Sequence, residues 1–148
     1  MVNADENCVL CAMAAGGEPE GGWLIRNDLV SGYLSGANRH LPGWCQLQVN
    51  RHATHLGELT AAEASAVGVA AGALGAAITA VTGGDRVYAY SICEASPHFH
   101  LVLGPPPAVG HGEQRGPALL ARVLARDPAL GDPAAAASVA ALLRTALR

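Results

Sequence analysis

A long run of small apolar residues, "AAEASAVGVAAGALGAAITAV" (61–81), constrains the fold of this chain more than any other feature. Thr60, followed three residues later by Glu63, forms the capping box typical of a helix start, and two glycines (83–84) supply a helix end. The run approaches the length of a membrane span, but Ala and Gly gain little from transfer into lipid and Glu63 interrupts it. We therefore expect one long, buried helix in a soluble protein.

Short segments on both sides of this run have the character of β-strands. Before the run they are "WLIRN" (23–27), "LVSGYLSG" (29–36) and "WCQLQVN" (44–50), and after it "RVYAYSIC" (86–93) and "HFHLVLG" (98–104), which ends at three prolines. These segments are β-branched, aromatic or alternating, as strands require. Two Ala/Leu/Arg-rich helical segments (117–126 and 133–147) follow. Strands, one long helix and more strands predict an α+β fold with a mainly antiparallel sheet.

The length, net charge and cysteine count of the chain limit the partners and the compartment that we expect for it. With 148 residues the chain is most simply one domain, and its formal net charge of -3 gives no electrostatic footprint for duplex nucleic acid or an anionic membrane. The first residues are acidic where a signal peptide would be basic, so we expect a cytoplasmic protein. In that compartment the four cysteines are expected to be reduced thiols or metal ligands rather than disulfides.

The pair Cys8 and Cys11 in "CVLC" has the spacing of one half of a zinc site. A redox motif would need a strand before Cys8, and the segment there is too short; two buried cysteines are the remaining alternative. Two further ligands would come from the six histidines (40, 52, 55, 98, 100 and 111). His52 and His98 stand at strand ends that an N-terminal turn could reach, whereas His55 has the position of a solvated neighbour. Spacing favours zinc without fixing which histidines bind it.

His98 and His100 raise a second question, because they are two residues apart in an apolar run. Alternation along a strand would place both on the same face. Metal ligands, a catalytic pair and two hydrogen-bonded core histidines all fit that placement.

Taken together, these motifs resemble the histidine triad (HIT) superfamily of nucleotidyl hydrolases and transferases. In order, "NCVLCAM" (7–13) resembles its cysteine-bearing start, "GWCQLQVNRHATHLGELT" (43–60) its strand, basic-His turn and helix start, and "PHFHLVLGPP" (97–106) its signature of alternating histidines. The resemblance covers about residues 5–107. It implies a HIT-like antiparallel sheet with the long helix packed on it, a domain over 1–107, a loop and helical extension of that domain over 108–148, and a homodimer.

The signature is incomplete, and two registers are open. A triad that begins at Ser96 lacks its first histidine, whereas one that begins at His98 has His100 in the middle and Val102 in place of the third histidine. We adopt the second register because it places Pro105 where many family members also carry a proline. It also leaves His98 as a zinc ligand, as in zinc-containing members. The metal ligands implied by the resemblance are Cys8, Cys11, His52 and His98.

The resemblance implies a covalent mechanism at His100. The middle histidine of the family attacks the α-phosphorus of a small nucleotide, such as a dinucleoside polyphosphate or a nucleoside phosphoramidate, or of another phosphorylated small molecule. Ser96 and His98 would touch this substrate. Two departures leave the activity open: Val102 neither donates a hydrogen bond nor carries charge, and the family's polar glycine-rich stretch before the triad is largely missing. The alternatives are a zinc-stabilised scaffold with lost or altered activity and a divergent biosynthetic enzyme whose metal has an open coordination position.

Overall fold

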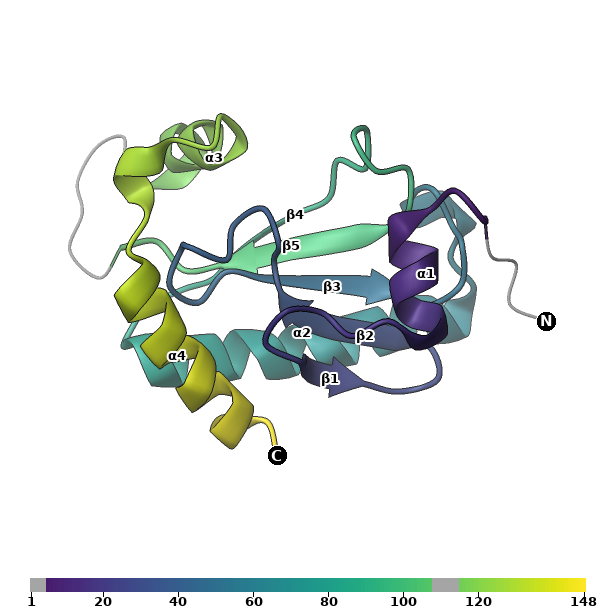
Figure 1. Ribbon diagram of the computed structural model, residues 1–148, viewed down its shortest axis with the longest axis horizontal. Helices are drawn as coiled ribbons and strands as arrows, with labels where there is room; N and C mark the ends of the chain where they lie inside the picture. Colours follow the sequence, from purple (N-terminus) through teal and green to yellow (C-terminus); the bar gives the residue numbers. More distant parts are fainter. Residues whose placement is uncertain (1–4, 108–114) are drawn as a thin grey trace.

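The computed structural model describes residues 5–107 and 115–148, and within them the chain has the predicted α+β architecture. Five strands form one antiparallel sheet in the order β1-β2-β3-β5-β4 (Figure 1). The strands are β1 (Trp23–Arg26), β2 (Val30–Leu34), β3 (Cys45–Val49), β4 (Tyr88–Tyr90) and β5 (His100–Gly104). The three central strands are therefore β2, β3 and β5, and the connection from β3 to β5 passes through the long helix and the edge strand.

The long helix α2 (Ala61–Thr82) covers one face of the sheet. Its capping box is complete, with Glu63 N–H donating to the Thr60 hydroxyl and the Glu63 carboxylate accepting from Thr60 N–H, and Gly83 ends it in the left-handed conformation at φ 71°. A stripe that includes Leu74 and Ile78, both 0% exposed, packs on the sheet. By length and composition alone α2 could cross a membrane, but it lies along the sheet instead.

The alternation of β3 decides what each face of the sheet carries. Cys45, Leu47 and Val49 belong to the core under α2, whereas Gln46 and Gln48 lie on the opposite face. The register places Gln46 opposite Val102 and Gln48 opposite His100 on β5. His100 and Val102 therefore share the face that α2 does not cover.

Two of the shorter helices, one at each end of the chain's sequence, cover parts of this second face, and a third packs on α2. The sequence did not predict α1 (Val9–Gly16), whose Leu10 carbonyl accepts a 2.9 Å hydrogen bond from the buried Gln48 amide. The tail forms α3 (Gly116–Leu124), the short 3-10 helix η3 (Pro128–Leu130) and α4 (Pro133–Ala146), close to the predicted helical segments; a second 3-10 turn, η1 (Leu56–Glu58), precedes α2. Figure 1 shows α1 and α3 toward opposite ends of the sheet, with α4 crossing α2.

All five strands are shorter than the segments predicted for them, and two of these differences lie close to the two histidines. β4 begins at Tyr88, and β5 begins at His100 rather than at His98. The reason for the second difference is local: His98 N–H donates to the Ser96 carbonyl at 2.7 Å, which closes a turn immediately before the strand. His98 therefore does not follow the alternation that the sequence predicted for it, and the two histidines have different surroundings.

Candidate functional site

Four side chains from three distant segments meet near α1. Their ligand atoms all lie within 4.8 Å of one another. They are Cys8, Cys11, His52 and His98, which we call the thiol–imidazole cluster. Cys8 is the residue that precedes α1, so the two thiols stand one helical turn apart, and His52 lies in the loop after β3. The structure thus brings together the four residues that the resemblance implied.

The rings of the cluster present the same nitrogen to the thiols. Nδ1 of His98 lies 3.3 Å from Sγ of Cys8 and 3.4 Å from Sγ of Cys11, and Nδ1 of His52 lies 3.2 Å from Sγ of Cys11. The Nε2 of His98 is 2.7 Å from the Val49 carbonyl, to which it donates. This bond fixes the tautomer and leaves Nδ1 as the unprotonated nitrogen, which is the arrangement that a metal-binding imidazole needs.

The donor set fits a tetrahedral metal ion. Bond lengths of about 2.3 Å to sulfur and 2.0–2.1 Å to nitrogen separate two ligands on zinc by roughly 3.6 Å, close to the separations found here. Burial raises the pKa of Cys11 and lowers the pKa of His98, which is 0% exposed. Both groups are therefore held neutral without a metal, and a divalent cation would stabilise the thiolates that burial disfavours.

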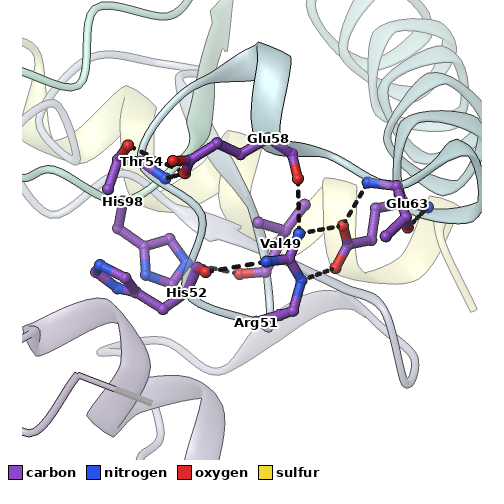
Figure 2. A network of polar contacts seen from close by, with 8 residues as sticks. Val49, Arg51, His52, Thr54, Glu58, Glu63 and His98 are labelled. Carbon is purple, nitrogen blue, oxygen red and sulfur yellow. Dashed lines mark hydrogen bonds and ion pairs between the residues drawn. The ribbon is translucent and has the colours of Figure 1, made fainter. Parts of the chain in front are cut away.

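A polar network connects the cluster with the start of α2 (Figure 2). The guanidinium of Arg51 donates to both carboxylate oxygens of Glu63 at 2.8 Å and to the carbonyls of His52 and Glu58. This bidentate pair lowers the pKa of Glu63 to about 2. The carboxylate of Glu58 in turn accepts from the backbone and hydroxyl of Thr54. The network holds the loop that carries His52 against a rigid helix end.

His100 lies on the other side of the same backbone segment. Its Nδ1 is 2.7 Å from the His98 carbonyl, so Nδ1–H donates and Nε2 is the unprotonated nitrogen. The ring lines a pocket of about 330 Å³ on the uncovered sheet face. The other polar residues that line this pocket are Ser35, Asn38, Gln46, Tyr90, Cys93, Glu94, Ser96 and Arg126.

The position of the missing third histidine is apolar and closed. Val102 is 5% exposed and belongs to a second hydrophobic cluster with Leu41, Trp44, Leu119 and Val123. The last two residues come from α3, so the tail packs on the sheet at this point. At the position where the resemblance predicts a third histidine, the chain has an apolar contact with α3.

The other residues that the sequence singled out lie in different places: some are in the cluster or the pocket, and others are in neither. Ser96 lines the pocket, whereas the ring of His98 faces the cluster and only its carbonyl reaches His100. His55 is exposed and caps η1, and the carbonyl of His40 accepts from Asp132 N–H. His111 lies outside the described residues.

Cys93 and Arg126 are two of the pocket residues that the sequence did not predict. Cys93, at φ 58°, has its sulfur 3.8 Å from Nδ1 of His100, and Arg126, at φ 54°, comes from the turn after α3. Neither belongs to a motif, because the tail and the loop before β5 approach His100 only in three dimensions.

Comparison with known proteins identifies the fold. No protein-family model and no curated protein matches the sequence. Among solved structures, a Hit-like protein involved in cell-cycle regulation from Bartonella henselae matches with TM-score 0.68 and 15% identity, over 97% of this chain and 99% of that chain. A zinc-bound histidine triad family protein from Mycobacterium smegmatis matches with TM-score 0.63 and 18% identity, over 95% and 93%.

A third structure, a hypothetical histidine triad nucleotide-binding protein from Sulfolobus tokodaii, matches with TM-score 0.67 and 11% identity, over 95% of this chain and 91% of that chain. These likenesses span nearly the whole of each chain. The protein therefore has the histidine triad fold, and the fold predicted from its motifs is confirmed.

Proposed function

We propose that this protein is a nucleotidyl hydrolase or transferase that acts on a small nucleotide through a covalent intermediate at His100. The observation that supports it most directly is the 2.7 Å bond from Nδ1 of His100 to the His98 carbonyl, on a ring that lines a pocket. A rigid strand, a fixed tautomer and a free nitrogen are what a nucleophilic imidazole requires.

The proposed reaction has two displacements. Nε2 of His100 attacks the α-phosphorus, a phosphorus–nitrogen bond forms, and the bond from phosphorus to the leaving group breaks. Ser96, at the rim of the pocket, is the proposed donor to the leaving group. Water then attacks phosphorus, its proton is lost to solvent, and the phosphorus–nitrogen bond breaks to release the nucleoside monophosphate and free His100. Dinucleoside polyphosphates and nucleoside phosphoramidates are the proposed substrate classes.

We propose zinc as the metal of the thiol–imidazole cluster, with a structural role. Two thiolates and two imidazoles close a four-coordinate site, so zinc there would supply folding energy and leave no position for substrate. The zinc-bound structural neighbour supports this choice of metal. The same closed set of four protein side chains disfavours a divergent enzyme that uses an open metal site.

The second candidate function is a binding scaffold without turnover. Val102 favours it, because an apolar residue at a position beside the nucleophile removes a donor that would stabilise charge on phosphorus. The loss of one such donor costs about 10²–10³ in rate. Slow hydrolysis and binding alone both fit that loss, and the covalent intermediate separates them.

We also propose that the protein is a cytoplasmic homodimer. The outward face of α2 carries exposed small residues, with Gly68, Gly72 and Ala76 at successive turns and Val69 74% exposed. Such a face allows close helix packing, and analytical ultracentrifugation would give the mass in solution.

The test of the proposed function is His100→Ala, with the exposed His55→Ala as a matched control. Incubation with a nucleoside phosphoramidate and with a dinucleoside polyphosphate, followed by intact-mass spectrometry after acid-free quenching, should detect a nucleotidyl adduct on wild type and on H55A but not on H100A. We expect turnover to fall by about 10³-fold or more in H100A, with zinc content and melting temperature retained.

Turnover that persists in H100A would refute the proposed nucleophile. Nucleotide binding by wild type without any adduct or turnover would establish the scaffold instead.

A further inference from the structure

We propose that Arg126 is the phosphate-binding residue of the His100 pocket, supplied by the C-terminal segment that the sequence resemblance does not cover. The inference rests on the proposed function, because it names the part of the substrate that the pocket recognises: a phosphate group carried by a small molecule.

The charge of the pocket favours a phosphate at Arg126. Among the described residues, 5–107 and 115–148, Arg126 is the one arginine that lines the pocket, and the other charged lining residue is Glu94. No lysine is present in the chain. His100, whose Nδ1–H donates to the His98 carbonyl, is an imidazole and not a permanently charged group. The guanidinium of Arg126 is therefore the one permanent cation that a phosphate in this pocket would meet.

The guanidinium of Arg126 has no ion pair or hydrogen bond with the described part of the protein, residues 5–107 and 115–148. Its neighbour Asp127 would be the natural partner, but that carboxylate is paired with Arg122 at 2.7 Å and accepts from Ala129 N–H at 2.9 Å. The ion pair beside Arg126 leaves it available to a ligand.

The backbone around Arg126 is held in place at the pocket by a hydrogen-bonded turn and by the packing of α3. Arg126 N–H donates to the Val123 carbonyl and Asp127 N–H to the Arg122 carbonyl, both at 3.0 Å, so the turn after α3 is closed on itself. α3 is seated on the sheet through the apolar cluster that contains Val102 and Val123, and both of these residues also line the pocket. The contact at Val102 thus also fixes the helix that immediately precedes Arg126.

The chemistry of the two groups differs in a testable way. A guanidinium has five donors in a planar fork, stays charged at all accessible pH values and pairs with phosphate oxygens in bidentate fashion. Val102 offers none of this. Glu94, which is exposed and also lines the pocket, would repel the same phosphate, so its neutralisation should act in the reverse direction.

The experiment measures affinity by isothermal titration calorimetry for AMP, adenosine and inorganic pyrophosphate. The proteins are wild type, Arg126→Gln, Arg126→Lys, Glu94→Gln and the terminal Arg148→Gln as the matched control. A charge-assisted hydrogen bond implies that R126Q weakens AMP and pyrophosphate binding about tenfold to a hundredfold, with adenosine binding and R148Q unchanged. We expect R126K to recover part of the loss and E94Q to tighten AMP binding about twofold to fivefold.

AMP binding by R126Q equal to that of wild type would overturn the inference. An equal loss of AMP and adenosine affinity would also overturn it, because the role would then be structural. A wild-type protein that binds AMP no better than adenosine would do the same.

Intact-mass spectrometry of wild type and R126Q after incubation with the nucleoside phosphoramidate, compared with these titrations, separates this inference from the proposed reaction. Phosphate affinity that depends on Arg126 without any adduct on His100 would leave Arg126 as the phosphate ligand and refute only the nucleotidyl transfer. An adduct on His100 with no effect of R126Q would do the opposite.

Discussion

His98 and His100 are two residues apart, yet the first belongs to a buried cluster and the second to a pocket that is open to solvent. His98 is 0% exposed, donates to a backbone carbonyl and turns its other nitrogen to two thiols. His100 is partly exposed, donates to the carbonyl of His98 and lines an open pocket. The thiol–imidazole cluster brings together the four side chains that the resemblance implied, whereas the pocket has Val102 at the position where the resemblance leads us to expect a third histidine.

The difference shows which interactions tolerate substitution. In the cluster every member is needed, because a missing ligand leaves a buried thiol or imidazole without a partner. In the pocket a lost donor can be replaced by a group from another segment, since the ligand is bound in solvent-accessible space. The tail packs against Val102 and brings Arg126 to the same pocket.

The largest expected effect is the loss of stability when the proposed metal is removed from the thiol–imidazole cluster. Removal of the metal with a chelator, or Cys11→Ser, should lower the free energy of unfolding by more than about 4 kcal/mol, because α1, the loop after β3 and the start of β5 lose their common anchor. Thermal unfolding with and without chelator, together with metal analysis, measures it. The matched control is Cys45→Ala, since Cys45 is buried in the core, far from the motif, and its pKa is raised to about 12 by burial.

C45A should lose about 1 kcal/mol and respond to the chelator as wild type does. A melting temperature that chelation leaves unchanged would show that the cluster is not a metal site.

A smaller effect on stability is expected at the Arg51–Glu63 ion pair, which holds the loop that carries His52. The pKa of Glu63 is about 2 in the folded protein, below its usual value of 4.5. Its stabilisation is therefore fully present above about pH 4.5 and is lost as the pH falls toward 2. Because Glu63 is buried and Arg51 is one-third exposed, we expect Glu63→Gln to cost about 2–3 kcal/mol at pH 7.

The measurement is the difference in unfolding free energy between E63Q and wild type from pH 7 to pH 2.5. This difference should shrink in acid, and the contribution of metal release cancels to first order. Glu18→Gln is the control, because Glu18 is exposed and its carboxylate forms no hydrogen bond or ion pair within the described part of the chain, so E18Q should show little pH-dependent difference from wild type. A constant difference across the range would contradict the assignment of the low pKa to this ion pair.

Local sequence signals predicted the parts of the molecule in which short segments decide the outcome. The capping box at Thr60 and the glycine at 83 set the ends of α2, and the two cysteines one turn apart identified half of the cluster. The turn before β5 is local, but the bond from the His98 ring to the Val49 carbonyl joins two segments far apart in the sequence, so no local signal predicted the surroundings of His98. The pocket escaped prediction for the same reason: Arg126 lines the His100 pocket only through packing of the C-terminal segment on the sheet.

The smallest effect tests whether Val102 seats α3 or merely fills space. Val102→His would restore an imidazole but place it among Leu119, Val123 and Trp44. The site is 5% exposed, so the added volume and the buried polar nitrogen should destabilise the fold by about 1–3 kcal/mol. The near-isosteric Val102→Thr keeps the volume and should cost less. Hydrogen exchange should show faster amide exchange in α3 of V102H than in V102T, accompanied by weaker AMP binding as Arg126 loses its support. If V102H instead bound AMP more tightly with α3 fully protected, a third histidine and the C-terminal helix would be compatible, and the replacement of one by the other would not explain this pocket.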